Sequence, residues 1–532
     1  MRVAHPSYGK AASAGETARA AIWHLLCILA LMWPAIVNRQ PLFFPDTTSY
    51  VRAADSAVYL TTGIATAWSD RIKAAKGPKA DRPTAKRAKA PPAAGPAPAQ
   101  SFGNDLANGQ IMAGRSPYFG SLLYAAYVSS DFWLFVLGQA AIAYWLLILI
   151  LRRFGRDDPR IVRLAAFAMA ALTTLPFCNS LLLADVLGGF GCIALMLIAT
   201  DTGGLRRWER IGLLALLAVS AVSHPTHVYI FVVMAIVLFG GRRLLRASLP
   251  PGGRWRWLAL PVILLGFVSA AVTDLAVTKV FGRAPQLVPL MTARFIEDGP
   301  GADYLRTHCD RPTFAVCAVR DRLPLSSQEF LWSRDPARGV FLTSDAPTRR
   351  ALSAEDRPFA IAVLKAYPLR QTGWMLRNTI EQALRFDVSF VNVTCTNPTR
   401  CWGSLPTRVG SVTLTTPSGR HLWPTRLLKV IHYLVAFVGL VAILSWLIAL
   451  IRRRLRSGAP ISADEATLCL WIGAGFAALA INAALGGAIS EPQGRYQARL
   501  IWIVPLIAGV LGLARTRYGS LGGKRMPVAS AL

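Results

Sequence analysis

Residues 131–151 read DFWLFVLGQAAIAYWLLILIL, and this stretch decides the class of the fold. Its 21 residues contain one charged side chain, Asp131, and the stretch is followed directly by Arg152 and Arg153. About 20 apolar residues in helical conformation cross the hydrocarbon core of a bilayer. An amphipathic helix of a soluble protein would carry polar residues on one face throughout. The stretch therefore predicts a transmembrane helix.

The composition of the whole chain indicates a polytopic membrane protein. Of its 532 residues, 53% are hydrophobic and 16% are charged, whereas soluble proteins contain about 25% charged residues. Disordered, collagen-like, coiled-coil and small disulfide-rich classes are excluded by the same figures. We predict an all-α integral membrane bundle of about ten transmembrane helices with an extramembrane mixed α/β outer domain. The predicted spans are 18–38, 131–151, 161–177, 182–200, 210–223, 226–241, 257–278, 427–451, 465–487 and 498–514.

The distribution of Lys and Arg predicts the orientation. The short loops after the second, fourth, sixth and eighth spans are rich in Arg, whereas residues 178–181 and 224–225 contain neither Lys nor Arg. Because Lys and Arg in short loops stay cytoplasmic, we expect both termini in the cytoplasm. This orientation requires residues 210–223 and 226–241 to be two crossings rather than one broken element. The net charge of +30 is then a topology signal and a contact with anionic lipids, not a nucleic-acid surface.

Three regions follow from the spans. Residues 1–278 form an N-terminal transmembrane region with a long first outer loop, residues 279–426 an outer domain, and residues 427–532 a C-terminal transmembrane region. Within the first loop, residues 71–100 are rich in Ala, Pro, Lys and Arg, cannot bury a core and are predicted to be disordered. A tether to an anionic surface and a tolerated insertion are both open interpretations of this segment.

The outer domain contains two predicted helices and four of the eight cysteines. Ala354 to Phe386 predicts two amphipathic helices broken at Pro368, which lie on the bilayer interface or pack over the spans. Residues 388–420 are predicted to be extended. An even set of cysteines outside the membrane favours disulfides in an oxidising compartment over metal binding, because no Cys-x-x-Cys spacing occurs. The local pairs are Cys309 with Cys317 and Cys395 with Cys401.

Ionisable residues recur at the predicted outer ends of the spans. Such groups are costly near a membrane and therefore indicate a functional site. A helical bundle can bring them together at one level. They are Asp46, Arg115, Asp185, His224, His227, Glu491, Arg495, Tyr496 and Arg499.

Each of these residues also has a structural interpretation. Asp46 and Asp185 suit the N-cap positions of helices. His224 and His227 can complete the turn around Pro225, or they can bind a divalent metal cation. The two C-terminal arginines can reach lipid headgroups. As a set, however, acids can accept a proton from a hydroxyl group, and guanidinium groups can bind a phosphate.

The order of these parts resembles the GT-C class of polytopic glycosyltransferases, which use polyprenyl-phosphate-linked sugars. Asp46 follows the first span, as the acidic residue of that class does, and Gly114 to Leu123 resembles the Pro-containing stretch before its second span. Asp185 resembles an acidic residue that opens a later outer helix. Arg495-Tyr496-Gln497-Ala498-Arg499 resembles the basic element on the phosphate side. The lone Asp46, where an acidic pair would bridge a metal, and the domain 279–426 depart from the class pattern.

The resemblance implies transfer of a sugar, with inversion, from a polyprenyl-phosphate donor to a lipid or glycan acceptor. Asp46 would be the general base, and Asp185 and the histidines would orient substrate or hold a divalent cation. Arg115, Arg495, Tyr496 and Arg499 would bind the donor phosphate. The expected location is a bacterial inner membrane, with a eukaryotic endomembrane left open. Alternatives are a polytopic transporter or flippase, an envelope-polymer ligase, and an assembly factor in which the outer charges only pair with one another.

Overall fold

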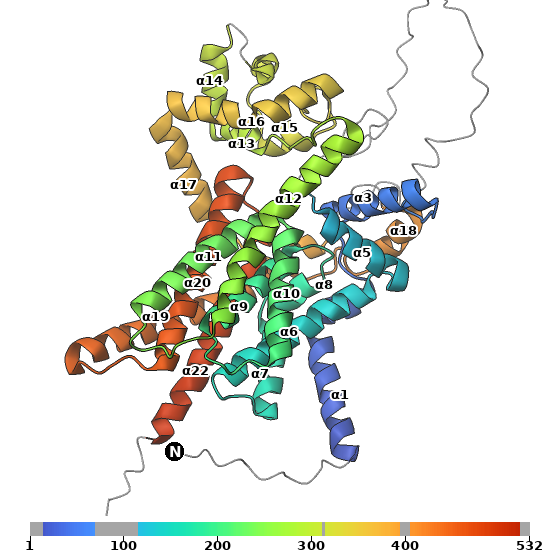
Figure 1. The fold of residues 1–532 in the computed structure, drawn as a ribbon. Helices are drawn as coiled ribbons and strands as arrows, with labels where there is room; N and C mark the ends of the chain where they lie inside the picture. The colour runs from blue at the N-terminus through green and yellow to red at the C-terminus, as the bar shows by residue number, and fades with distance from the viewer. Residues whose placement is uncertain (1–13, 70–114, 311–313, 394–404, 522–532) are drawn as a thin grey trace, which may run out of the picture.

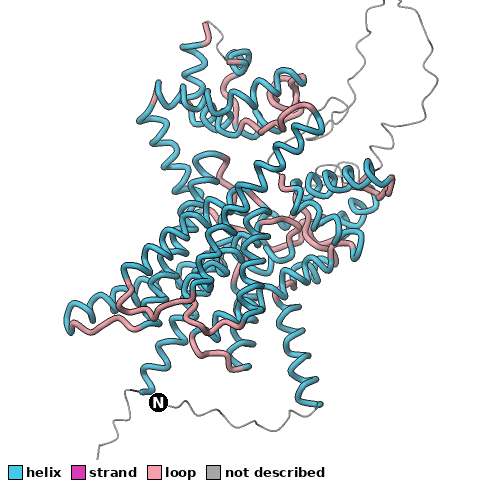
Figure 2. The backbone as a smooth tube through the Cα atoms, viewed as in Figure 1, coloured by secondary structure: helices cyan, strands magenta, loops and turns pink. Residues whose placement is uncertain are grey.

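A computed structural model describes residues 14–69, 115–310, 314–393 and 405–521 (Figure 1). These residues form a helical bundle with a layer of short helices at one end, and Figure 2 shows helices and loops without a strand among them. Their one β-type pairing is an isolated bridge between Leu42 and Leu181. The predicted all-α bundle is therefore confirmed for the described residues. The described part of the predicted outer domain is helical rather than mixed.

Six helices of the described residues are long and apolar enough to cross a membrane. Each coincides with a span predicted from the sequence, and together they establish the chain as an integral membrane protein by length and composition. The six segments are Trp133–Arg153 (α6), Pro225–Leu244 (α11), Arg254–Val280 (η2 Arg254–Leu258 and α12 Ala259–Phe281), Thr425–Ser457 (α19), Ala463–Ile489 (α20 Ala463–Ala484 and η7 Leu485–Ile489) and Gly494–Leu513 (α21 Gly494–Ile501 and α22 Ile503–Leu521).

The other four predicted spans form shorter or broken helices. The first is divided near Pro34 and the third near Pro176, because proline cannot continue the hydrogen-bond ladder of a preceding helix. The fourth and fifth each form one short helix, and the fifth is separated from α11 at His224-Pro225, as predicted. The resulting helices are α1 (Ala14–Ala30), α2 (Trp33–Asn38), α7 (Pro159–Leu172), α8 (Leu175–Ser180), α9 (Asp185–Thr200) and α10 (Arg207–Ser223).

Helix α9 lies at the centre of the bundle, and every one of its residues is buried. Its glycines let neighbouring elements approach closely. A Cβ atom on Gly189 would lie 2.9 Å from the carbonyl oxygen of Arg499 and 2.6 Å from the Trp502 ring. A Cβ atom on Gly191 would lie 2.2 Å from the ring of Phe231 in α11. Small residues therefore set the distance of α9 from α11 and α21, as in other membrane bundles.

Ion pairs join the arginine-rich loops at the end of the bundle from which α1 and α22 extend (Figure 1). Three loops far apart in sequence therefore lie together, as the predicted orientation requires of loops on one side. The first turn of α10 is held at the same end through Glu209 and Arg210. The pairs are Arg152 with Glu209 at 2.5 Å, Arg153 with Asp464 at 3.3 Å and Arg210 with Asp201 at 3.4 Å.

At the opposite end, helices α13 to α17 form a separate layer, which we call the helical domain. Its own hydrophobic core includes Phe295, Phe330, Phe341 and Phe359. The two amphipathic helices predicted around Pro368 are confirmed as α16 and α17. The helices are α13 (Leu290–Asp298), α14 (Pro300–His308), η3 (Ala315–Arg322), α15 (Ser327–Trp332), α16 (Ala346–Ala366) and α17 (Pro368–Leu384).

The residues after α17 and the cysteines of the helical domain differ in how well they match the prediction. The described part of the segment predicted to be extended, residues 388–393 and 405–420, forms η4 (Ser389–Val391), α18 (Thr407–Thr415) and turns, because tertiary packing overrides the strand preference of Val and Thr. The predicted Cys309–Cys317 disulfide is present. The predicted Cys395–Cys401 pair and the basic segment 71–100 lie outside the described residues. On the other flank, α3 (Pro45–Thr62) and α5 (Pro117–Ser130) lie side by side (Figure 1).

The packing of α9 predicts that Gly189→Ala destabilises the protein. The added methyl group would meet the backbone of α21, and overpacking of this kind costs about 1–3 kcal/mol. Gly138→Ala in α6 is the matched control, because nothing lies within 4 Å of its added Cβ atom. Thermal unfolding of the purified protein in detergent should show a lower midpoint for Gly189→Ala alone. Equal midpoints for the two variants would contradict the packing.

Candidate functional site

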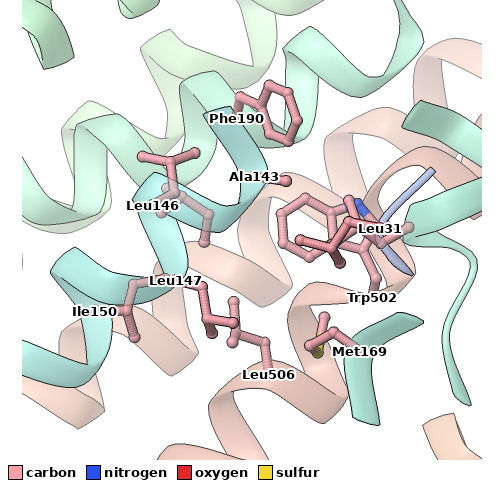
Figure 3. A pocket seen from close by; sticks show the side chains of 11 residues that line it. Leu31, Ala143, Leu146, Leu147, Ile150, Met169, Phe190, Trp502 and Leu506 are labelled. Atoms are coloured by element: carbon pink, nitrogen blue, oxygen red, sulfur yellow. The ribbon is translucent and has the colours of Figure 1, made fainter. Parts of the chain in front are cut away.

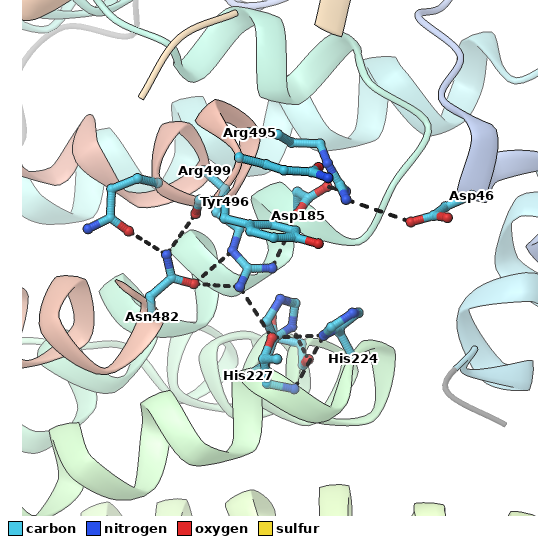
Figure 4. Close-up of polar contacts among 12 residues, drawn as sticks. Asp46, Asp185, His224, His227, Asn482, Arg495, Tyr496 and Arg499 are labelled. Carbon is cyan, nitrogen blue, oxygen red and sulfur yellow. Dashed lines mark hydrogen bonds and ion pairs between the residues drawn. The ribbon is translucent and has the colours of Figure 1, made fainter. Parts of the chain in front are cut away.

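The carboxylate of Asp185 lies between two arginines of α21 (Figure 4). Its Oδ2 accepts a hydrogen bond from Arg495 Nη1 at 2.7 Å, and its Oδ1 accepts one from Arg499 Nη1 at 3.2 Å. The Asp185 side chain is 5% exposed. A charge removed from water in this way must be paired, and here each carboxylate oxygen has its own cationic partner. The predicted N-cap role of Asp185 is wrong, because Ala184 holds that position and no side chain caps the helix.

Arg499 is itself buried and hydrogen-bonds to two further helices. Its Nε donates to Asn482 Oδ1 at 3.1 Å, and its Nη2 donates to the same oxygen at 2.5 Å and to Thr226 Oγ1 at 3.2 Å. Asn482 belongs to α20 and Thr226 to the first turn of α11. Arg499 therefore joins three helices and does not reach toward headgroups as the alternative interpretation expected. Its role is to fix the depth of α21 in the bundle.

The second carboxylate, Asp46, lies at the more open side of this cluster. Arg115 Nη2 donates to its Oδ1 at 2.5 Å, and Arg495 Nη2 lies 3.7 Å from its Oδ2. The side chains of Asp46 and Arg115 are 27% and 33% exposed. Asp46 lies in the first turn of α3 but does not cap it, because Phe44 is the N-cap and its N–H donates to Thr47 Oγ1 at 3.1 Å.

Local sequence explains why Arg115 reaches Asp46. Ser116 caps α5 by accepting from the N–H of Phe119, and its hydroxyl donates to the carbonyl of Val222 at 2.6 Å, which ties the start of α5 to the end of α10. Pro117 then suits the first helical position. Gly120 lets α3 approach, since a Cβ atom there would lie 2.8 Å from the carbonyl oxygen of Tyr50. Arg115 is thereby held beside the first turn of α3.

Aromatic rings surround the arginines on this side. The Arg495 guanidinium lies 4.2 Å from the centre of the Phe44 ring and 5.0 Å from that of Tyr496, which is cation–π distance. Burial raises the pKa of Tyr50 to about 12, so its phenol stays protonated at neutral pH. Burial alone would lower the pKa of Arg115, but Asp46 and Tyr50 outweigh it and raise that pKa above its ordinary value. Arg115 is therefore charged.

The two predicted histidines line the lower edge of the cluster (Figure 4). His224 is the N-cap of α11, and its Nδ1 accepts from the N–H of Thr226 at 3.2 Å, which confirms the turn-completing interpretation. Nδ1 of His227 lies 2.8 Å from the carbonyl oxygen of Ser220. Among the described residues, no group of three or more His, Cys, Asp or Glu side chains is arranged to hold a metal. Neither histidine is thus part of a complete ligand set there.

The cluster carries an unbalanced charge. Three arginines and two aspartates give 3 − 2 = +1 when all five are ionised. The Nε–H of Arg495 is buried and has no hydrogen-bond partner among the described residues. A buried donor without a partner is uncommon and costs free energy. The site therefore offers both a net positive charge and a free donor to an anion.

A small apolar crevice with a volume of about 20 Å³, roughly that of one water molecule, lies next to this cluster inside the bundle; Figure 3 shows its lining. Trp502 connects the two, because its ring lines the crevice while its Nε1 donates to the carbonyl of Arg499 at 2.8 Å. The crevice is lined by apolar side chains alone. They are Leu31, Ala143, Leu146, Leu147, Ile150, Met169, Leu175, Phe190, Ile193, Trp502 and Leu506.

The structure brings most of the residues predicted from the sequence together. Asp46, Arg115, Asp185, Arg495 and Arg499 form one network, with Tyr496 stacked against it. Glu491 is the exception, since it bonds Gln328 of α15 instead.

Two contributors to this network were missed by the sequence interpretation. Asn482 carried a signal, because it is the sole Asn or Gln within the predicted span 465–487 and polar groups inside spans are usually functional. Thr226 gave no such signal in the sequence. The chain matches no known family model, and no curated protein or solved structure is significantly similar to it.

The burial of the two carboxylates predicts different effects on stability. Asp185→Asn leaves two buried arginines without their counterion, which costs about 3–5 kcal/mol in comparable cases. Asp46→Asn removes a partly exposed pair and should cost about 1 kcal/mol or less. Thermal unfolding in detergent should therefore show a much larger loss for Asp185→Asn. The reverse order would contradict the central position of Asp185.

Proposed function

We propose that this protein is a membrane glycosyltransferase that moves a sugar from a polyprenyl-phosphate donor to a lipid or glycan acceptor. The observation that carries the proposal is the network of Asp46 and Asp185 with three arginines, because it combines a partly exposed carboxylate with a net positive charge. A polyprenyl-phosphate sugar has the two matching groups, namely an anomeric carbon that a hydroxyl group can attack and a phosphate. The resemblance to the GT-C class supports the same chemistry.

Arg495 is the residue we assign to the donor phosphate. The phosphodiester of the donor carries one negative charge, which matches the single excess positive charge of the network. The leaving phosphate gains a second charge as its bond to the sugar breaks, and guanidinium donors stabilise such developing charge. The unpartnered Nε–H of Arg495 is available for this contact. Arg115 and Tyr496 complete the phosphate side, and Arg499 holds α21 in place.

Asp46 is the residue we assign as general base. Its Oδ2 lies 3.7 Å from Arg495, too far for a hydrogen bond, and so remains free to accept a proton. The acceptor hydroxyl gives its proton to Asp46 while its oxygen attacks the anomeric carbon. The bond from that carbon to the phosphate oxygen breaks on the opposite face, which inverts the configuration. Asp185 is saturated by two arginines and acts as a positioning residue.

We also propose the membrane topology and the cellular location that the sequence predicts. Both termini lie in the cytoplasm, about ten segments cross or enter the membrane, and the helical domain with the site faces the outside of a bacterial inner membrane. The arginine-rich loops at the opposite end contact anionic lipids. A divalent cation at His224 and His227 stays a hypothesis that requires a ligand from the substrate.

An assembly factor without catalytic activity is the second candidate. It is favoured by one observation, namely that each of the five charges has a partner of opposite charge within the network. In that case the pairs would serve stability alone. The two candidates differ in what Asp46→Asn does, because only an enzyme needs the carboxylate to accept a proton.

Asp46→Asn should abolish transfer while the protein still folds. Loss of a general base lowers a rate by about 10²–10⁴-fold. Mass spectrometry of envelope lipids and polysaccharides should show the loss of one glycosyl increment in cells without the gene. The increment should be absent also with Asp46→Asn and Arg495→Ala.

Asp131→Asn is the control for this experiment. Asp131 is exposed and follows α5, where its left-handed backbone suits asparagine equally well. Cells with this variant should retain the glycosyl increment. If Asp46→Asn and Arg495→Ala both leave envelope glycans unchanged while the proteins are present in the membrane, the transferase proposal is wrong.

A further inference from the structure

Helix α17 of the helical domain buries a stripe of amides rather than apolar side chains. Gln371, Asn378 and Gln382 are 0%, 1% and 0% exposed, and their spacing of seven and four residues places them on one helical face. Leu369 and Leu376 point away and are 88% and 61% exposed. A buried amide requires hydrogen-bond partners. The partners of this stripe therefore indicate what the helix does.

The first two amides anchor α17 to its own domain. Gln371 Nε2 donates to Asp298 Oδ2 at 3.1 Å, and Asn378 Nδ2 donates to Asp298 Oδ1 at 2.9 Å. Asp298 ends α13 and is 3% exposed, and Arg294 lies 2.8 Å from the same carboxylate. The buried carboxylate thus ties α17 to α13 through charge-assisted hydrogen bonds, which are stronger than neutral ones.

The third amide, Gln382, bonds the segment that leads into α21. Its Nε2 donates to the carbonyl of Gln493 at 3.0 Å, and its Oε1 accepts from the N–H of Gln493 at 2.7 Å. Gln493 is the N-cap residue of α21, and its carbonyl also accepts from the N–H of Tyr496 at 3.0 Å. One side chain of the helical domain therefore holds, at two points, the residue from which the arginine helix begins.

Two close approaches strengthen this contact. A Cβ atom on Gly487, in the π-helical turn η7, would lie 2.2 Å from the carbonyl oxygen of Asn378, so the backbones of η7 and α17 touch. A Cβ atom on Gly494 would lie 2.6 Å from the carboxyl carbon of Asp387, which follows α17. Backbone atoms of α17 require glycine at position 487, whereas at position 494 the glycine leaves room for the Asp387 side chain. The start of α21 is therefore enclosed by α17 and the residues after it.

We infer that the helical domain positions the arginines of the site, and that Gln382 is the positioning residue through which it acts. Arg495 lies two residues after Gln493, so a shift of Gln493 moves the guanidinium relative to both aspartates. Arg499 lies one helical turn further on and transmits the same shift to Asn482 and Thr226. The effect on sugar transfer rests on the proposed function, whereas the effect on α21 does not.

The test compares Gln382→Met with Glu381→Gln in the full-length protein in nanodiscs. Methionine has a similar length but makes neither hydrogen bond to Gln493, whereas Glu381 is an exposed neighbour on the same helix. Hydrogen–deuterium exchange should be about tenfold faster in peptides covering residues 490–501 with Gln382→Met. Exchange in α6 and the midpoint of thermal unfolding should stay close to the wild-type values. Glu381→Gln should change none of these.

Gln382→Glu provides the second variant, in case methionine prevents folding. Its carboxylate can accept from the N–H of Gln493 but cannot donate to the carbonyl, so the exchange rate should lie between those of wild type and Gln382→Met. Exchange in residues 490–501 that equals the wild-type rate in either folded variant would overturn the inference. Uniform acceleration over the whole chain would overturn it also, because it would show a purely structural role.

The transfer assay separates this inference from the proposed function. If the inference holds, Gln382→Met lowers the glycosyl increment in parallel with the faster exchange. Faster exchange in residues 490–501 together with an unchanged increment for Arg495→Ala would support the positioning role and reject the transferase. Loss of the increment for Arg495→Ala with unchanged exchange for Gln382→Met would support the transferase and reject the positioning role.

Discussion

The burial of Asp185 between Arg495 and Arg499 is the constraint on which the rest of the structure depends. A carboxylate that is 5% exposed within a bundle requires cationic partners, and removal of either side would leave an uncompensated charge. The pairing therefore fixes α9 and α21 at one depth. The glycine at position 189 allows the close approach that this pairing demands. Because Arg495 also faces Asp46, the same constraint locates the open side of the network.

The helical domain and the bundle meet at the residues that carry the site. Arg495 and Arg499 lie on α21, and α17 holds the start of this helix. Asn482 binds Arg499 within the helix, and Trp502, the residue after the helix, lines the apolar crevice. The helical domain is thereby attached to the spans at the start of α21.

Part of this arrangement could be predicted from the sequence, because charged residues are conspicuous next to long apolar runs. Asp185, Arg495 and Arg499 stand out because a charge beside an apolar run is costly, and their convergence followed from their common predicted level. Gln382 and Gln493 could not be found in this way, because amides are ordinary in an extramembrane segment. The extended backbone predicted for residues 388–420 is wrong for the described residues 388–393 and 405–420, because packing against the bundle overrides the local preference for extended backbone. Pro34 itself predicts a break in the first helix, although residues 18–38 are predicted here as one unbroken span.

The most direct measurement is an experimental structure of the full-length protein in nanodiscs, determined with and without added decaprenyl phosphate. We expect Arg495 to contact Asp185 and to face Asp46 in both states, and the added phosphate to bind at the Nε–H of Arg495. A structure in which Asp46 and Asp185 lie at opposite membrane surfaces, or in which the phosphate binds away from Arg495, would contradict this expectation.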